Sequence, residues 1–248
     1  KGSSYAAALV QLLSSYYSRA KSRIYDVLIL SMTERWYRAV LTRLAPGSVV
    51  LDVGIGTAGA LLRCRDVVES RDLRIVGIDI DRSYVDAGRA SAAEAGLSDR
   101  ITIDLVDIYD GREAVDELCR AVGAEADSAG KFVDAVYFSG SFSLLPDPVK
   151  ALRLASGLVK KRGRRDHEYE GAAGRIYITQ TYQKRTPFFL SYVKPLLKYA
   201  TTIDFGRLVR EDEVLRTFEE SGLEVLEHGV VRGSVDNSLQ AAYLSVLR

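Results

Sequence analysis

The sequence has few of the residues that hold metal ions or form cross-links. Its 248 residues include only two cysteines and two histidines. Cys64 and Cys119 lie far apart in helix-like segments without paired spacing, which favours a reducing compartment over a disulfide framework. With His167 and His228 as the only histidines, a histidine-based metal site is not expected. We therefore predict no bound metal.

Long apolar runs and a strong excess of one charge are also missing. No stretch reaches the roughly 18 apolar residues of a transmembrane helix, so no integral membrane segment is predicted. The formal charge of +1 argues against a general nucleic-acid binder. A hydrophobic fraction of 47% predicts a chain that buries a substantial core. The sequence starts at Lys1 rather than Met, as a trimmed chain would, and we expect an intracellular, cytoplasmic protein with a mitochondrial location as the alternative.

The most informative stretch runs from Val49 to Gly59. Residues 49–53 predict a parallel strand that is buried on both faces. Gly54 and Gly56 follow at once and allow a tight turn with a close backbone approach, and residues 58–69 have helical spacing. Backbone N–H groups converge at such a turn and favour a nucleotide ligand. A purely structural turn between strand and helix is the alternative.

Two further buried strands are predicted, and each ends in an acid. Residues 74–80 contain Asp79, about 20 residues past the glycines, where nucleotide-binding folds place a ribose-binding acid. Residues 101–107 end in Asp107. Together with Asp52, these acids are expected at the edge where α/β sheets bind ligands.

Residues 51–57, 77–81 and 106–108 together resemble the class I S-adenosylmethionine-dependent methyltransferases. The likeness continues through 133–139 and 174–179, and so covers about residues 45–248. It implies an α/β fold with a Rossmann-like, mainly parallel sheet of seven strands, helices on both faces and an antiparallel C-terminal hairpin. It also implies S-adenosylmethionine as cofactor and S-adenosylhomocysteine as product.

A nicotinamide dehydrogenase is the competing interpretation, because Gly54, Gly56 and Gly59 satisfy the pattern Gly-x-Gly-x-x-Gly. Asp52, two residues before the first glycine, instead follows the methyltransferase pattern. One departure is Ala58, which stands where the methyltransferases often have a third alternate glycine.

The resemblance also implies residue roles. Asp52 and the glycine turn would surround the methionyl end of the cofactor, Asp79 would bind the ribose hydroxyls, and Asp107 would lie against the adenine. The expected cofactor contacts are Asp52, Gly54, Ile55, Gly56, Thr57, Gly59, Asp79, Ile80, Asp107, Ile108, Ser139, Ser141 and Tyr25. No residue identifies itself as a general base, so the catalytic residues are left unassigned.

Two segments are expected to cover this site. Residues 1–45 predict two helices, which either pack against the sheet or close over it as a lid, ahead of a methyltransferase domain at 46–248. Residues 183–208, rich in aromatics and edged with lysines, would roof an apolar acceptor pocket, become buried core or touch a membrane surface. The candidate substrate contacts are Tyr16, Tyr17 and Tyr182.

Two other segments bear on the partner. The basic run 160–165 opens an insertion at about 162–173 and is expected to be a solvated loop rather than a nucleic-acid site. Residues 24–26 and 34–38 resemble the start of the quinone-biosynthesis C-methyltransferases. The Arg-Asn pair of those enzymes is replaced here by Ser139-Gly140-Ser141 and the residues after it.

The sequence thus predicts an enzyme that transfers a methyl group from S-adenosylmethionine to a small, partly apolar molecule. Because a sulfonium is already a good leaving group, such a protein mainly aligns two substrates and excludes water. The alternatives are a non-catalytic binding or scaffold protein of the same fold, and a methyltransferase acting on a protein or lipid at a membrane surface.

Overall fold

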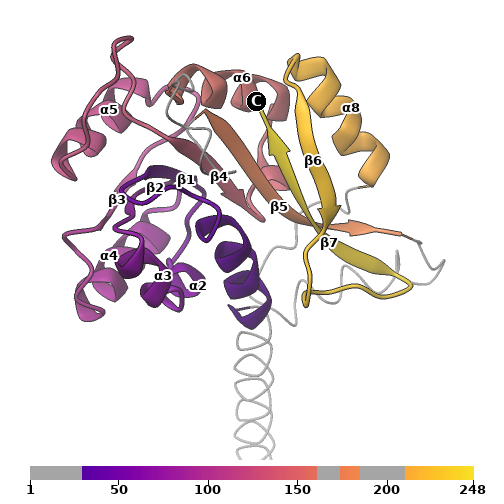
Figure 1. Cartoon of the computed structure of the whole chain (residues 1–248), viewed down its shortest axis with the longest axis horizontal. Coiled ribbons are helices and arrows are strands. Elements are labelled where there is room, and N and C mark those ends of the chain that lie inside the picture. The colour runs from indigo at the N-terminus through magenta and orange to yellow at the C-terminus, as the bar shows by residue number, and fades with distance from the viewer. Residues whose placement is uncertain (1–29, 161–173, 185–209) are drawn as a thin grey trace, which may run out of the picture.

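The computed structural model describes residues 30–160, 174–184 and 210–248. At its centre is a seven-stranded sheet with the strand order β3-β2-β1-β4-β5-β7-β6 (Figure 1). The strands are β1 (Val49–Val53), β2 (Arg74–Asp79), β3 (Ile101–Leu105), β4 (Ala135–Ser139), β5 (Arg175–Gln183), β6 (Val225–Val230) and β7 (Gln240–Leu247). Strands β1 to β5 pair in parallel, and β7 runs antiparallel to both β5 and β6. The predicted mainly parallel sheet with an antiparallel C-terminal hairpin is confirmed.

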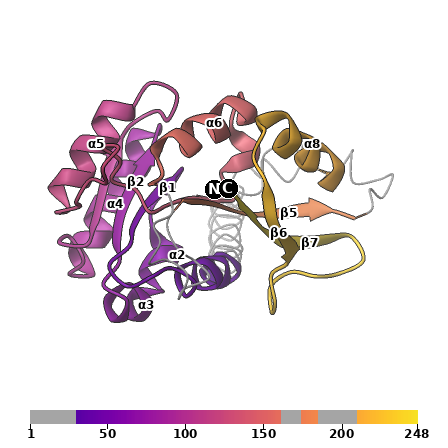
Figure 2. The ribbon, with the colours of Figure 1, turned by 45° about the horizontal axis from the view of Figure 1, so that its top comes forward.

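Helices cover both faces of the sheet (Figure 2). One layer consists of the helical residues 30–41, α2 (Gly59–Leu62), α3 (Arg65–Ser70) and α4 (Arg82–Glu94). The other consists of α5 (Arg112–Ala121), α6 (Pro148–Leu158) and α8 (Glu211–Ser221), and a short 3-10 helix, η1 (Phe142–Leu144), follows β4. Each layer encloses its own hydrophobic core against the sheet.

The pattern of the first strand explains why both faces are covered. All five residues of β1 are buried. Val50 belongs to the core on the side of α2 to α4, whereas Val49, Leu51 and Val53 belong to the core on the side of α5, α6 and α8. Successive side chains of a strand point to opposite faces, so a strand that is buried along its whole length needs a helix layer on each side.

The ends of two helices follow from local sequence. Asp147 caps α6 by accepting the backbone N–H of Lys150 at 2.9 Å, and Pro148 occupies the first turn, where its missing N–H costs nothing. Helix α8 carries three acids in its first turn and ends at Gly222, whose φ is 78°.

The helix predicted over residues 58–69 is divided in the structure. A short turn, in which the Cys64 N–H donates to the Leu61 carbonyl at 2.8 Å, separates α2 from α3. Leu61, Cys64 and Val68 are all fully buried against the sheet. A spacing of three followed by four keeps these side chains on one face when the chain tightens by one residue at Cys64.

Other boundaries differ by a few residues. Strand β3 ends at Leu105, so Asp107 lies in the loop that follows. Strand β5 continues to Gln183, beyond the predicted 174–179, because β7 pairs along its whole length. Residues 1–29 of the two predicted N-terminal helices, all of the insertion at 162–173 and nearly all of the acceptor-side segment 183–208 lie outside the described residues. No helix within the described ranges is long and apolar enough to cross a membrane.

Candidate functional site

The glycine turn after β1 has the backbone conformation that its sequence predicts. Gly54 has φ 74° and Gly56 has φ 60°, values that side chains disfavour. The Gly54 N–H donates to the Ile78 carbonyl of β2 at 2.8 Å, which fixes the start of the turn. Ala58 also has a positive φ, 57°, and tolerates the left-handed conformation that the family glycine would adopt freely.

Two glycines outside the turn let other elements approach it. A Cβ on Gly77 of β2 would lie 2.4 Å from Cδ1 of Ile55, so this glycine makes room for the Ile55 side chain. A Cβ on Gly88 of α4 would lie 3.1 Å from the Gly56 carbonyl oxygen. The sequence reasoning did not single out these positions as part of the site, although a glycine inside a buried strand is a sign of close approach.

Asp52 lies in β1, just before the turn, and is 1% exposed. The Tyr37 hydroxyl donates a hydrogen bond to its Oδ2 at 2.7 Å, while Oδ1 is buried with no hydrogen-bond partner among the described residues. Burial raises the pKa of the Asp52 carboxyl to about 7, the Tyr37 hydrogen bond opposes that rise, and the nearby Asp79 adds to it. The sequence reasoning did not identify Tyr37.

Asp79, at the end of β2, accepts two backbone hydrogen bonds. Its Oδ2 accepts the N–H of Gly56 and its Oδ1 accepts the N–H of Asp81, both at 2.9 Å. The acid therefore ties the glycine turn to the end of the neighbouring strand. Ile80, the next residue, is 76% exposed, an unusual position for a large apolar side chain.

The third acid lies at the same edge, beyond β3. Asp107 is exposed and accepts the Tyr109 N–H at 3.0 Å, and Ile108 beside it is buried. A Cβ on Gly111 would lie 2.6 Å from the Asp107 carbonyl oxygen, so this loop is tightly folded.

The loop after β4 closes over the glycine turn. The Ser141 hydroxyl donates to the Val53 carbonyl, and its Cβ lies so close that a Cβ on Gly54 would be only 2.5 Å away. Ser139, at the end of β4, has a buried hydroxyl that makes no hydrogen bond of regular geometry within the described residues. Strands β4 and β2 flank β1 on its two sides.

The structure thus brings most of the predicted cofactor contacts to one edge. Lying at or just beyond the carboxyl ends of β1 to β4 are Asp52, Gly54, Ile55, Gly56, Thr57, Gly59, Asp79, Ile80, Asp107, Ile108, Ser139 and Ser141. Carboxyl ends of adjacent parallel strands are where open α/β sheets bind ligands. Tyr25 lies outside the described residues, as do Tyr16 and Tyr17.

Tyr182, the remaining candidate substrate contact, is 1% exposed in β5. Its ring lies 5.2 Å from that of Tyr243 and 5.9 Å from that of His228. His228 is held through both ring nitrogens, by Ser245 at 2.9 Å and Glu211 at 3.1 Å. These side chains pack together on β5, β7 and β6, the strands at the edge of the sheet that is remote from β1.

The two cysteines are buried, and the described acids form no cluster that could hold a metal ion. Cys64 and Cys119 are buried and free, and burial raises the pKa of each thiol to about 12. Across residues 30–160, 174–184 and 210–248, no group of three His, Cys, Asp or Glu side chains is arranged to hold a metal ion.

No known family model matches the sequence, but many solved structures share the fold. A crystal structure of the cyclase SpnF matches with a TM-score of 0.59 and 16% identity, over 87% of this chain and 80% of that one. Geranyl diphosphate C-methyltransferase from Streptomyces coelicolor, solved with S-adenosylhomocysteine, matches with a TM-score of 0.57 and 13% identity, over 88% of this chain and 78% of that one.

A methyltransferase from Aquifex aeolicus, described as dependent on S-adenosylmethionine, matches with a TM-score of 0.54 and 16% identity, over 86% of this chain and 89% of that one. At such identities the likeness concerns the fold. This chain has the Rossmann-like fold of the S-adenosylmethionine-dependent methyltransferases, including those that act on small molecules.

Proposed function

We propose that this protein binds S-adenosylmethionine and transfers its methyl group to a small, partly apolar molecule. One observation carries the proposal: Asp52, a buried carboxylate with one oxygen that has no partner among the described residues, lies directly before a left-handed glycine turn. The unpaired oxygen suits an ammonium group, and the turn leaves room for a ligand to approach the backbone. A nicotinamide cofactor offers no ammonium group to such an acid.

The other edge residues suit the remaining parts of this cofactor. Asp79 would bind the ribose hydroxyls with the carboxylate that already steadies the turn, and Ile80 and Ile108 would enclose the adenine, with Asp107 at its rim. Thr57, Gly59, Ser139 and Ser141 would line the methionyl end. These assignments follow the resemblance in the sequence and are supported by the shared position of the residues at one sheet edge.

The bound cofactor would supply an activated methyl group on a sulfonium. The chain's own contribution is then to hold the donor and the acceptor in line and to keep water out. None of the described residues at the edge is placed as a dedicated general base, so an acceptor that is nucleophilic at neutral pH fits best. The acceptor-side residues, 183–208, fall almost entirely outside the described ranges.

The acceptor class is inferred from proteins of similar fold and from the composition of the sequence. Several proteins of similar fold are named as methyltransferases of small molecules, geranyl diphosphate among them. The aromatic composition of residues 183–208 and the likeness of 24–38 to the quinone-biosynthesis enzymes favour an apolar acceptor. We infer a small-molecule partner rather than nucleic acid. Methylation at a membrane surface remains the alternative that the lysine-edged aromatic segment suggests.

The fold alone does not decide the reaction, since one similar structure is named as a cyclase. Calorimetric titration with S-adenosylmethionine, S-adenosylhomocysteine and NADH tests the cofactor. Micromolar binding of the first two without NADH supports the proposal. Binding of none of them would favour a scaffold protein. Binding of both without methyl transfer to any of a panel of apolar acceptors would favour a non-methylating reaction.

Replacing the exposed Ile80 tests the adenine assignment. Ile80→Ser should weaken S-adenosylhomocysteine binding by about fivefold, because the ligand would lose about 1 kcal/mol of apolar contact. The melting temperature should not change, because the side chain is 76% exposed. Leu215→Ser on α8, where the side chain is 39% exposed, is the matched control. Equal affinity in both variants would remove Ile80 from the site.

A further inference from the structure

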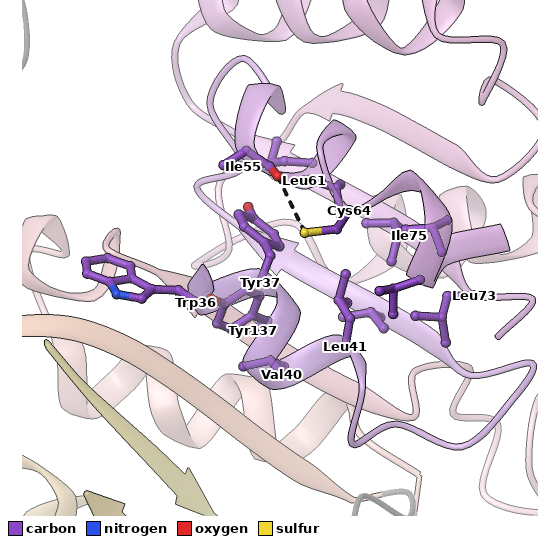
Figure 3. Close-up of a cluster of buried hydrophobic side chains, with 14 of the residues drawn as sticks. Trp36, Tyr37, Val40, Leu41, Ile55, Leu61, Cys64, Leu73, Ile75 and Tyr137 are labelled. Atoms are coloured by element: carbon purple, nitrogen blue, oxygen red, sulfur yellow. Dashed lines mark hydrogen bonds between the residues drawn. The ribbon is translucent and has the colours of Figure 1, made fainter. Parts of the chain in front are cut away.

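The helical residues 30–41 reach the cofactor edge through one buried polar contact. Tyr37 is 3% exposed, and its hydroxyl donates to Asp52 Oδ2 at 2.7 Å. Its ring stands edge-on to that of Tyr137 in β4, with the centroids 5.1 Å apart at 89°. Figure 3 shows Tyr37 between Tyr137 and Ile55, with its hydroxyl end toward Ile55, whereas the Trp36 side chain extends in another direction from the same helix. The contact therefore lies deep beneath the glycine turn.

Contacts other than the one to Asp52 also hold this helix in place. Trp36 Nε1 donates to the Ser234 hydroxyl at 2.9 Å, and Arg43, just past the helix, forms two hydrogen bonds to Glu227 at 2.5 and 3.1 Å. Arg38 pairs with Asp66 of α3 at 2.7 Å. The position of Tyr37 is thus set from several sides, and its hydroxyl meets Asp52 in a fixed direction.

The Asp52 carboxyl is incompletely satisfied in this arrangement. A buried carboxylate with one donor on one oxygen and none on the other is costly, and such groups call for an explanation. The groups that face it are Tyr37 from the helix, Tyr137 from β4 and Asp79 from β2, and the interaction with Asp79 raises the Asp52 pKa further. No cationic side chain of the described residues bonds to it.

We propose that Tyr37 is a positioning residue of the cofactor site: its hydroxyl holds one oxygen of Asp52 and leaves the other directed at the ammonium group of the methionyl end. This inference rests on the proposed function. In this proposal the helix 30–41 orients Asp52 through Tyr37, and the glycine turn supplies the backbone that the ligand approaches. A ligand without the ammonium group would gain nothing from Tyr37.

Proton linkage follows from the same geometry. A cation at Oδ1 favours the ionised carboxylate, whereas burial favours the protonated form. Binding of S-adenosylhomocysteine to the wild-type protein should therefore release protons between pH 6 and 7, and its affinity should rise with pH over that range. The ligand 5′-methylthioadenosine, which has no amino acid part, should bind without this release.

The first test compares two aromatic replacements in the same helix. Tyr37→Phe removes the hydroxyl that bonds Asp52, and Trp36→Phe removes the bond to Ser234 as the matched control. At pH 7, Tyr37→Phe should weaken the binding of S-adenosylhomocysteine by about tenfold, which is the expected loss for a charge-assisted hydrogen bond. The affinity for 5′-methylthioadenosine should not change. The midpoint of the pH dependence of S-adenosylhomocysteine binding should also move to higher pH. Trp36→Phe should alter neither ligand by more than about twofold.

The second test uses only the wild-type protein, so that a poorly folding variant does not decide the matter. Each ligand is titrated by calorimetry at pH 6.5, once in phosphate buffer and once in imidazole buffer. The difference between the two heats of binding gives the number of protons released. More protons released by S-adenosylhomocysteine than by 5′-methylthioadenosine supports the inference. Equal proton release by the two ligands overturns the inference, and so does an equal loss of affinity for both ligands in Tyr37→Phe. Failure of the wild-type protein to bind either ligand would instead refute the proposed function.

Discussion

Asp52→Asn is expected to make the folded protein more stable at pH 8 and a poorer binder of S-adenosylhomocysteine. The Asp52 carboxyl has a usual pKa of 3.8 and a pKa of about 7 in the fold. Because the native state binds the proton more tightly, this group lowers the free energy of unfolding as the pH rises from about 4 to about 7. At about 1.4 kcal/mol for each pKa unit, ionised Asp52 costs about 4 kcal/mol at pH 8.

Asparagine removes that charge and still offers Tyr37 an acceptor. Its amide nitrogen would be buried without a partner, at a cost of about 2 kcal/mol, so the net gain at pH 8 is about 2 kcal/mol. At pH 5 the gain should vanish, because the fold then stabilises only the protonated carboxyl, whose protonation costs about 2 kcal/mol above the usual pKa of 3.8, and the amide penalty cancels that cost. Urea unfolding at both pH values measures this. A lost ion pair to the ligand should weaken binding by about tenfold to a hundredfold.

Asp134→Asn is the matched control for Asp52→Asn. Asp134 lies at the opposite end of the same strands, where it accepts the Val49 N–H at 2.7 Å and pairs with Lys160 at 3.1 Å. Its loss should lower stability at pH 8 by about 1 kcal/mol and leave ligand affinity unchanged. If Asp52→Asn destabilised the protein equally at pH 5 and pH 8, the carboxyl would not carry the proposed burial cost. Unchanged affinity would remove it from the cofactor site.

Gly54→Ala should destabilise the ligand-free protein by about 3 kcal/mol. The φ of 74° costs an alanine about 1 kcal/mol, and the new Cβ would lie 2.5 Å from Cβ of Ser141, which must move. Moving Ser141 breaks its hydrogen bond to the Val53 carbonyl. Gly56→Ala is the matched control, because Gly56 has φ 60° and open space around it, and should cost about 1 kcal/mol.

Urea unfolding without ligand compares the two glycine variants. Ser141→Gly in the Gly54→Ala background should restore part of the lost stability, since it removes the Cβ that collides. Equal losses in Gly54→Ala and Gly56→Ala would mean that the loop after β4 does not press on the turn. The same result would weaken the assignment of Ser141 to the site.

The local parts of this molecule were predictable from sequence, and the long-range parts were not. The largely apolar run 49–53, the closely spaced glycines and Asp79 depend mainly on the local backbone, so the strand, the turn and the position of this acid at the sheet edge could be predicted. The helix that carries Tyr37 was predicted, but Tyr37 itself was not identified as a site residue. Its contact with a carboxylate depends on how the helix crosses β1, which the sequence does not show.

Close packing around Gly77 and the length of β5 account for two further features of the site that could not be predicted from sequence. Gly77 could have been identified as a contact point from its place in a buried strand, but its partner, Ile55, emerges only from the packing. Tyr182 was predicted as a substrate contact from its place after the fifth strand. In the structure β5 continues through it, and Tyr243 and His228 cover its ring. Its role stays a prediction, as do those of Tyr16, Tyr17 and Tyr25.

The anchoring of helix 30–41 to the last hairpin has a consequence for biosynthesis. The bond from Trp36 to Ser234 spans 198 positions of the sequence, and that from Arg43 to Glu227 spans 184. Contacts between such distant residues form late in folding, because a long loop must close first. On the ribosome, the glycine turn and its acids emerge long before the hairpin that steadies Tyr37. A nascent chain that ends after β5 therefore carries the glycine turn and its acids but lacks Glu227 and Ser234, which hold the helix of Tyr37 in the complete protein.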